Sequence, residues 1–282
     1  MSGGTLYLVA TPIGNLGDIT LRAIDVLRAV PRIAAEDTRL TRRLLARYDI
    51  ATPMTSYHAR SASGRAAALL AHLRAGEDLA LVTDAGTPAV SDPGADLVNA
   101  WAAEGGRVVP IPGPSAVLAA VAVAGVTGPR WSFEGFLPRS GRERRARLAA
   151  IAADERGTVL FEAPGRVAAT LRDLVAACGD ERAGAVCREL TKLHEEVVRG
   201  TLGELATAAA DGTIPARGEF VLVVGMAATT PEERSAPSDA AVRLALAEVD
   251  RLITAGTARG EAARRVAAAT GIPRRRLYEV AR

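Results

Sequence analysis

The chain has 282 residues, a formal net charge of +3 and 49% hydrophobic residues. This size and balance indicate a globular protein of one large or two modest domains, and the mild positive charge is compatible with a nucleic-acid partner. The longest apolar stretch, Ser115–Thr127, is too short for a bilayer span of about 20 residues, and the N-terminus lacks the pattern of a signal peptide. The two cysteines, Cys178 and Cys187, form no disulfide framework. We therefore expect a cytoplasmic protein with no membrane partner.

Short apolar runs alternate with helical patterns over residues 1–124. The expected strands are Thr5–Ala10, Arg32–Ala35, Leu79–Thr83 and Arg107–Ile111, and the expected helices are Ile19–Ala29, Arg65–Arg74 and Asp92–Glu104. This alternation is typical of a mostly parallel sheet covered by helices. It predicts a first α/β domain over residues 1–124.

A Gly- and Pro-bearing stretch, Ala124–Pro129, then reads as a linker, and a second alternating region follows it. The expected strands there are Trp131–Phe136, Thr158–Phe161, Ala185–Arg188, Val197–Leu202 and Phe220–Gly225, and the expected helices are Arg142–Ala153, Arg166–Cys178 and a short one between the last two strands. We predict a second α/β domain over residues 130–228, with mixed strand directions.

The end of the chain has a different pattern. Thr229–Ser238 is polar and contains prolines, as in a linker. Residues 238–282 then read as helical, with a long helix followed by a helix, a TGIP turn and another helix. This order is typical of a helix-turn-helix.

Loops rich in glycine and proline follow four strands of the first domain: ATPIGNLGD, AEDTR, TDAGTPAVSDPG and PIPGPSAV. Glycine lets a ligand approach the backbone, proline holds a loop in shape, and the carboxyl edge of a parallel sheet is where ligands bind. The chain has no G-x-G-x-x-G after its first strand, no P-loop and no G-x-S-x-G elbow. Its three histidines are scattered, so we expect no metal site.

Several motifs resemble one family in order and spacing. They are TLYLVATPIGNLGDITLRA, AAEDTR, LVTDAGTPAVSDPG, VVPIPGPSA, FEGFLPR, RELTKLHEEVVRGTLGEL and GEFVLVVG, which together cover Thr5 to about Gly225. The sequence resembles the bacterial 16S rRNA cytidine ribose 2'-O-methyltransferases of the tetrapyrrole-methylase superfamily, which are class III enzymes that use S-adenosylmethionine. The resemblance implies two αβα domains with a cofactor cleft between them and a small all-helical C-terminal extension.

The resemblance also implies a homodimer that methylates the ribose of a cytidine in the decoding region of 16S rRNA, in the small ribosomal subunit. It assigns S-adenosylmethionine binding to two groups of residues. Those of the first domain are Thr11, Pro12, Asp84, Gly86, Thr87, Ser115 and Ala116, and those of the second are Glu162, Arg188 and Glu189. One position departs from the family pattern, because Gly165 stands where members usually have a histidine.

Methyl transfer to a ribose hydroxyl is helped by a base or by a group that stabilises the oxyanion. The candidates are Asp37, Glu134, Glu189 and Lys192. We favour Asp37 and Lys192 as catalytic residues, since Lys192 is the only lysine in a chain dominated by arginine. The alternative for Lys192 is a surface ion pair with Glu195 or Glu196.

Binding to RNA requires positive charge on an accessible face. Arginines cluster along three segments, and the alternative for each cluster is a solvated helix face. The predicted RNA-binding residues are Arg39 and Arg42 in the first cluster and Arg139, Arg142, Arg144 and Arg145 in the second. The third cluster lies in the tail and includes Arg264, Arg265, Arg274, Arg275 and Arg276.

Two other functions fit the same scaffold. A C-methyltransferase acting on a tetrapyrrole of the precorrin type would share the fold, but it would not need the arginine clusters. A ribosome-assembly factor that binds RNA and cofactor without catalysis is the third possibility, and Gly165 leaves it open. Replacement of Asp37 or Lys192 separates these cases, because a catalytic residue can be removed without loss of RNA binding.

Overall fold

The computed structural model describes residues 3–58, 63–227, 239–270, 272 and 274–279. The chain divides into two compact units, residues 1–227 and 228–282, which are described separately. The linker predicted at Thr229–Ser238 lies outside the described residues. None of the described helices is long and apolar enough to cross a membrane.

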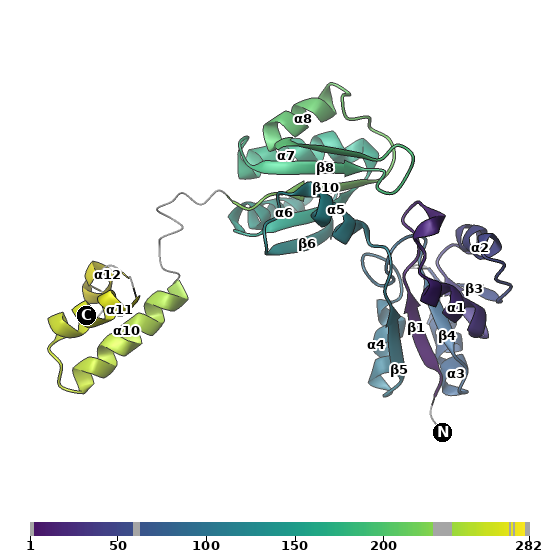
Figure 1. The fold of residues 1–282 in the computed structure, drawn as a ribbon, viewed down its shortest axis with the longest axis horizontal. Coiled ribbons are helices and arrows are strands. Elements are labelled where there is room, and N and C mark those ends of the chain that lie inside the picture. Colours follow the sequence, from purple (N-terminus) through teal and green to yellow (C-terminus); the bar gives the residue numbers. More distant parts are fainter. Residues whose placement is uncertain (1–2, 59–62, 228–238, 271, 273, 280–282) are drawn as a thin grey trace. The chain divides into compact units, whose positions relative to one another are not determined.

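The first sheet of unit 1 is parallel throughout, as the alternating pattern predicts. Its strands are β1 (Thr5–Val9), β2 (Arg32–Ala35), β3 (Met54–Ser56), β4 (Leu79–Val82) and β5 (Arg107–Ile111). They lie in the order β3-β2-β4-β1-β5, and each adjacent pair is parallel. The loops that follow β1, β2, β4 and β5 therefore gather at one edge of the sheet (Figure 1).

Helices cover both faces of this sheet and bury its apolar side chains in two clusters. They are α1 (Leu21–Ala29), α2 (Thr38–Arg47), α3 (Ser63–Arg74) and α4 (Ala95–Ala103), with a short 3₁₀ turn η1 (Leu16–Asp18) before α1. Helix α2 and the three-residue strand β3 were not expected from the sequence. Asp37 caps α2 by accepting a hydrogen bond from the Arg39 N–H (2.8 Å), and Thr41, Leu44 and Leu45 form its buried face.

The second sheet is mixed, again as predicted. Its strands are β6 (Trp131–Phe136), β7 (Gly157–Glu162), β8 (Ala183–Arg188), β9 (Glu196–Thr201) and β10 (Phe220–Val224). The order is β6-β7-β10-β8-β9, in which only β6 and β7 are parallel. The end of β7, the end of β8 and the start of β10 are thus side by side, because Phe220 pairs with both Glu162 and Arg188.

Four helices pack on the second sheet. They are α5 (Ala116–Ala124), α6 (Gly141–Ala153), α7 (Val167–Cys178) and α8 (Leu202–Ala210). Helix α5 falls inside the range predicted for the first domain, yet it packs against β8, β9 and β10 through Val117, Ala120 and Ala124. The domain limit expected at residue 124 therefore follows a helix that belongs by packing to the second sheet.

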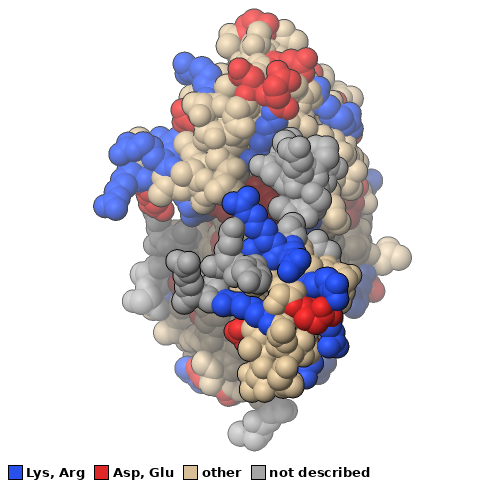
Figure 2. All heavy atoms as spheres, turned by 90° about the vertical axis from the view of Figure 1, so that its left-hand side faces the viewer, with Lys and Arg blue, Asp and Glu red and all other residues tan. Residues whose placement is uncertain are grey.

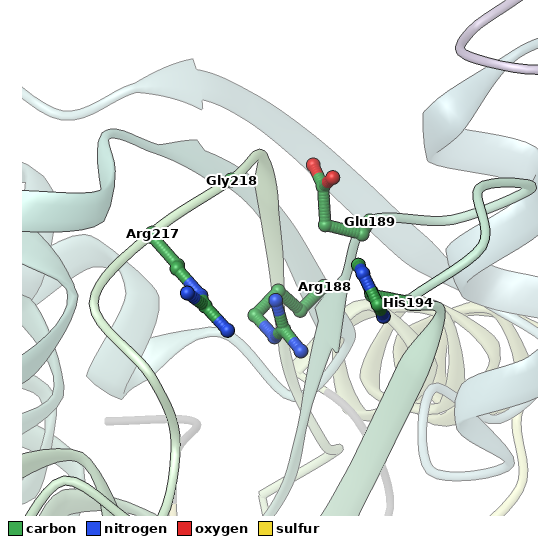
Figure 3. A pocket seen from close by; sticks show the side chains of 5 residues that line it. All are labelled: Arg188, Glu189, His194, Arg217 and Gly218. Carbon is green, nitrogen blue, oxygen red and sulfur yellow. The ribbon is translucent and has the colours of Figure 1, made fainter.

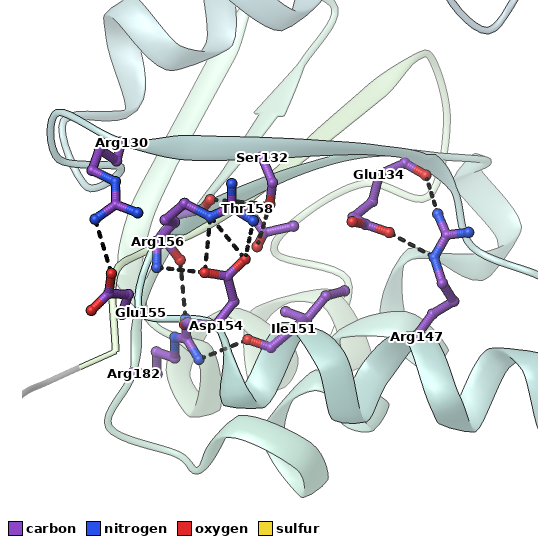
Figure 4. A network of polar contacts seen from close by, with 11 residues as sticks. Arg130, Ser132, Glu134, Arg147, Ile151, Asp154, Glu155, Arg156, Thr158 and Arg182 are labelled. Carbon is purple, nitrogen blue, oxygen red and sulfur yellow. Dashed lines mark hydrogen bonds and ion pairs between the residues drawn. The ribbon is translucent and has the colours of Figure 1, made fainter. Parts of the chain in front are cut away.

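A buried arginine fixes one end of the second sheet. Arg182 donates hydrogen bonds to the backbone carbonyls of Ile151 (3.2 Å) and Gly225 (2.9 Å), and to those of the turn between α6 and β7 (Figure 4). In the same turn, Asp154 accepts from the guanidinium of Arg156 (2.8 Å). Because backbone carbonyls satisfy the buried guanidinium, we assign Arg182 a structural role: it joins the edge of the second sheet to the turn between α6 and β7.

The described residues of unit 2 form helices, in agreement with the predicted all-helical C-terminal extension. It consists of α10 (Asp239–Thr254), α11 (Arg259–Thr270) and α12 (Arg274–Glu279). Its own core includes Val249, Val266, Ile272 and Leu277. Gly271 and Pro273 of the predicted turn lie outside the described residues.

Candidate active site

The loops after β1 and β4 are joined by a pair of backbone hydrogen bonds. The Thr11 N–H donates to the Gly86 carbonyl (2.9 Å), and the Gly86 N–H donates to the Thr11 carbonyl (3.0 Å). The Thr11 hydroxyl also donates to the Thr83 carbonyl (3.1 Å), and its side chain is buried. Gly86 has a φ of 78°, which favours glycine. Thr11 and Pro12 thus support the loops without lining a cavity in the described residues.

A cavity of about 440 Å³ lies between these loops and the edge of the second sheet. This volume is within the range of about 300–1,000 Å³ that is usual for small-molecule sites. Six of the predicted cofactor residues line it: Asp84, Gly86, Thr87, Ser115, Ala116 and Glu162. The prediction that loops distant in sequence converge at one strand edge is therefore consistent with the cavity, while their role in binding stays a prediction.

Three carboxyl groups from the first domain line the cavity: Glu36 after β2, and Asp84 and Asp92 after β4. Burial raises the pKa of all three, and the charges of Glu36 and Asp84 help to raise the pKa of Asp92 to about 6. Glu36 and Asp92 were not among the predicted site residues. Their signal was their position in the quoted loops AEDTR and SDPG, but only the fold brings them beside Asp84.

The opposite wall of the cavity is largely apolar. It includes Phe136, Phe161, Leu190 and Val221, and the rings of Phe136 and Phe161 lie 5.5 Å apart. Phe136 is 55% exposed, so this wall presents an aromatic ring to solvent at the cavity. An apolar wall facing three carboxylates suits a nucleoside that carries positive charge, since the base needs apolar contact and the charge needs partners.

Glu162 ends β7 at the cavity, where three groups hold its buried carboxylate. It accepts hydrogen bonds from the Thr170 hydroxyl (2.6 Å) and the Ala163 N–H (2.9 Å), and it pairs with Arg166 (3.1 Å). Arg144 in turn donates to the Thr170 hydroxyl (2.9 Å). This network sets the shape of the loop that contains Gly165, where an added Cβ would meet no atom within 4 Å.

The structure changes the interpretation of Asp37. Asp37 caps α2 and forms an ion pair with Arg39 (2.7 Å), and its hydrogen bonds with Arg39 lower the pKa of its carboxyl to about 2. Its backbone N–H donates to the Asp84 carboxylate (2.9 Å), and its side chain does not line the cavity among the described residues. A carboxyl with so low a pKa is a poor proton acceptor at neutral pH, so Asp37 is unsuited to be the base.

Lys192 lies beside the cavity but is not part of its wall in the described chain. Its ammonium donates to Glu189 (2.7 Å) and Glu219 (2.9 Å), and these carboxylates raise its pKa above the usual value against the opposing effect of burial. The expected alternative partners, Glu195 and Glu196, are not the ones observed. A Cβ on Gly14 would meet the Lys192 stem, so the PIGNL loop packs directly on this side chain.

Arg188 and Glu189, two predicted cofactor residues, line a different hollow of about 290 Å³ with His194, Arg217 and Gly218 (Figure 3). Gly218 lines this hollow and the larger cavity, so the two are neighbours. Glu134, also considered as a base, lies on β6 and is paired with Arg147 (2.6 Å, Figure 4).

The predicted RNA-binding arginines fall into two kinds. Arg39, Arg42, Arg139, Arg142 and Arg145 are exposed. Arg144 is buried, and its guanidinium is bound by Asp173, Thr170 and the Pro138 carbonyl. The structure therefore removes Arg144 from the RNA-binding set, because its face of α6 packs inward with Leu148 and Ile151.

The remaining clusters begin three residues after a residue that lines the cavity. Arg39 follows Glu36 by three residues, and Arg139 follows Phe136 by three. On the face drawn in Figure 2, basic side chains form several separate groups with acidic and uncharged atoms between them. Within the part of the chain that the structure describes, no cluster of three or more His, Cys, Asp or Glu residues could hold a metal ion.

Comparison with known proteins agrees with this architecture. The model of the tetrapyrrole (corrin/porphyrin) methylases matches residues 5–206. The chain therefore belongs to the tetrapyrrole methylase family.

Within that family, curated relatives are named ribosomal RNA small subunit methyltransferase I. The one from Synechocystis sp. is 48% identical over 98% of this chain and 97% of its own length, and the one from Xylella fastidiosa (strain Temecula1) is 44% identical over 98% of each. Among solved structures, uroporphyrin-III C-methyltransferase from Thermus thermophilus, in complex with S-adenyl homocysteine, matches with a TM-score of 0.58. It is 21% identical over 79% of this chain and 97% of that one, which shows the shared fold.

Proposed function

We propose that this protein uses S-adenosylmethionine to methylate the ribose 2'-hydroxyl of a cytidine in the decoding region of 16S rRNA. One structural observation carries the proposal. A cavity at the strand ends has three carboxylates from the first domain and a largely apolar surface from the second, where the carboxylates Glu162 and Glu219 form ion pairs. Exposed arginines follow the lining residues Glu36 and Phe136 in the chain. The relatives that cover almost the whole chain are named for methyl transfer to small-subunit rRNA, in line with this substrate.

The cavity fits the methyl donor in charge as well as in size. S-adenosylmethionine, when bound, supplies an electrophilic methyl group on a sulfonium. Glu36, Asp84 and Asp92 place negative charge on the wall, where it stabilises a bound cation, and the apolar wall excludes water around it. The first turn of α5 at Ser115 and Ala116 offers backbone N–H groups of a helix N-terminus, which suit a carboxylate.

Transfer requires the acceptor oxygen to be held in line with the methyl carbon, about 3–3.5 Å away. Residues that fix the loops therefore contribute without touching the reacting atoms. We assign this role to Lys192, whose ammonium ties Glu189 to Glu219 and whose stem packs on Gly14. The ribose must be unpaired or extruded from the RNA to enter the cavity.

The two alternatives predict different outcomes. Methylation of a tetrapyrrole is the activity named for the similar solved structure. That structure is 21% identical to this chain, so the similarity supports a shared fold and not a shared substrate. An assembly factor without catalysis would bind RNA and cofactor and transfer no methyl group.

A labelling experiment tests the proposal. The protein is incubated with labelled S-adenosylmethionine and unmethylated small ribosomal subunits, and the RNA is digested to map the label. We expect label on one cytidine ribose, loss of label with Asp84→Asn, and no change with Asp25→Asn, which alters an exposed carboxylate on α1. Label only on a tetrapyrrole, or cofactor binding without transfer to any RNA, would refute it.

Two finer proposals follow from the family. We propose a homodimer, for which the exposed Leu21, Leu118 and Leu193 offer apolar contact area, and light scattering of the purified protein tests it. We also propose a cytoplasmic location, because the substrate is the small ribosomal subunit.

A further inference from the structure

The smaller hollow beside the cavity is lined by three basic side chains, Arg188, His194 and Arg217, and by one carboxylate, Glu189. Arg188 ends β8, His194 lies in the loop between β8 and β9, and Arg217 precedes the start of β10. In Figure 3 the guanidinium groups of Arg188 and Arg217 extend toward one another, with His194 on the other side of Arg188. The Glu189 carboxylate points away from all three (Figure 3).

Arg188 is positioned in advance to bind a ligand. Its side chain is only 10% exposed, and its Nε donates to Glu196 (2.9 Å), which fixes the plane of the guanidinium. In the described part of the chain, the structure gives its two terminal nitrogens no protein acceptor. Four N–H groups of a buried, oriented guanidinium are therefore left for an oxoanion.

Both carboxylates near the hollow, Glu189 and Glu196, already have basic partners. Glu189 accepts hydrogen bonds from Lys192 (2.7 Å) and from the Glu219 N–H (2.9 Å), and these contacts lower its pKa and keep it ionised on its own side. Glu196 is paired with Arg188. Arg217 is exposed, and the described residues offer it no ion pair. Two guanidinium groups that face each other repel, and an anion between them relieves that cost.

The position of the hollow identifies the anion. Gly218 lines both the hollow and the cavity, and Glu219 lines the cavity next to it. Gly218 has a φ of 93°, and a Cβ there would lie 2.7 Å from the Glu189 side chain, so only glycine allows this thin wall. We propose that the hollow binds a backbone phosphate of the substrate RNA next to the ribose that enters the cavity. The proposal rests on the proposed function, in which the acceptor is an RNA ribose.

A test uses Arg217→Gln, because Arg217 is exposed and its loss leaves no buried charge. Arg172→Gln is the matched control, since Arg172 is an exposed arginine on α7 outside both the hollow and the cavity. Small-subunit binding is measured by filter binding across a salt series, cofactor Kd by calorimetry, and methyl transfer by label. RNA binding and methyl transfer are measured separately. A protein that binds RNA but never methylates it would therefore refute the proposed function, while the binding data would still test whether the hollow binds a phosphate.

For Arg217→Gln we expect RNA binding about tenfold weaker at low salt, and a slope of log K against log salt smaller by about one. The cofactor Kd should stay within twofold of the wild type, and Arg172→Gln should match the wild type throughout. If the cofactor Kd rises instead and RNA binding does not change, the hollow binds the carboxylate of the methyl donor and the proposal is wrong. An unchanged salt slope, or a wild type that binds no small-subunit RNA, would also overturn it.

Discussion

Replacement of Asp92 by asparagine should stabilise the free protein and weaken its binding of the methyl donor. Burial, together with the charges of Glu36 and Asp84, raises the pKa of Asp92 to about 6, against a hydrogen bond from Thr83 that lowers it. The folded state thus disfavours the carboxylate of Asp92 in the absence of a cation. An amide has nearly the same shape and no charge, so the variant removes this cost and also removes one partner of the bound cation.

The effect on stability depends on pH. Because the folded pKa lies above the unfolded value of about 3.8, the folded state holds the proton more tightly, and wild-type stability falls as pH rises from about 4 to about 6. The full shift corresponds to about 3 kcal/mol, and solvent screening at this half-buried group reduces it to about 1 kcal/mol. For unit 1 this is a gain in Tm of about 2–4 °C for the variant above pH 7, and almost none near pH 4.

The effect on binding has the opposite sign. Between pH 5 and pH 7.5 the wild type should bind S-adenosylmethionine more tightly as Asp92 ionises, by about tenfold for an interaction of 1–2 kcal/mol. Asp92→Asn should lack most of this gain, so its Kd above pH 7 should be about tenfold higher than that of the wild type.

Thermal unfolding of the free protein and calorimetric titration with the cofactor, both at pH 5 and pH 7.5, measure the two effects. Asp25→Asn on α1 is the matched control, because that carboxylate is exposed and lies outside the cavity. A variant that melts below the wild type at pH 7.5, or one that binds the cofactor as tightly as the wild type there, would refute the electrostatic account of the cavity.

Three further substitutions test the surroundings of the site. Lys192→Met leaves Glu189 and Glu219 without their shared partner, so single-turnover methylation should slow by up to about a hundredfold. The RNA Kd from filter binding should change less than twofold, and an equal loss of methylation rate and RNA affinity would contradict a positioning role. Gly165→His enters open space, so its Tm should stay within about 2 °C of the wild type and its methylation should be no slower. Arg144→Met removes a buried guanidinium at a cost of about 2–3 kcal/mol, so Tm should fall by about 5–10 °C, whereas the exposed Arg145→Met should leave Tm unchanged and weaken RNA binding.

The sequence predicts the parts of the fold that depend on local pattern. Apolar runs bounded by Gly and Pro located every described strand except β3, and loops such as TDAGTP predicted which sheet edge carries the cavity. Helix α2 was missed although its signals were present, with Asp37 as the N-cap and Thr41, Leu44 and Leu45 at helical spacing. The arginines between those positions interrupt the apolar pattern and make the segment read as a basic cluster.

Other features could not be predicted because they depend on tertiary contacts. Helix α5 is apolar on almost every side, so its composition does not tell which sheet it covers. The position of Arg144 at helical spacing from Leu148 and Ile151 indicates a buried face, but Asp173 and Thr170, which satisfy it, come from α7. The pKa of Asp92 likewise depends on Glu36, which is 56 residues earlier in the chain.

The two sheets contribute different charged groups to the site, and this difference suits the two substrates. Loops of the parallel sheet contribute Glu36, Asp84 and Asp92 to the cavity. The mixed sheet contributes Arg188 and Arg217 to the hollow, and its carboxylates Glu162, Glu189 and Glu219 form ion pairs with Arg166 and Lys192. A methyl donor that carries a sulfonium and an acceptor that carries phosphates need opposite potentials a short distance apart. Gly218 separates the two regions with a wall of backbone alone. The proposed reaction therefore brings a cation and a polyanion together, each beside side chains of opposite charge. Methyl transfer turns the sulfonium into a neutral thioether and the ribose hydroxyl into a methyl ether, and the hydroxyl proton is released to solvent. The thioether product thus loses the attraction of the acidic wall and dissociates.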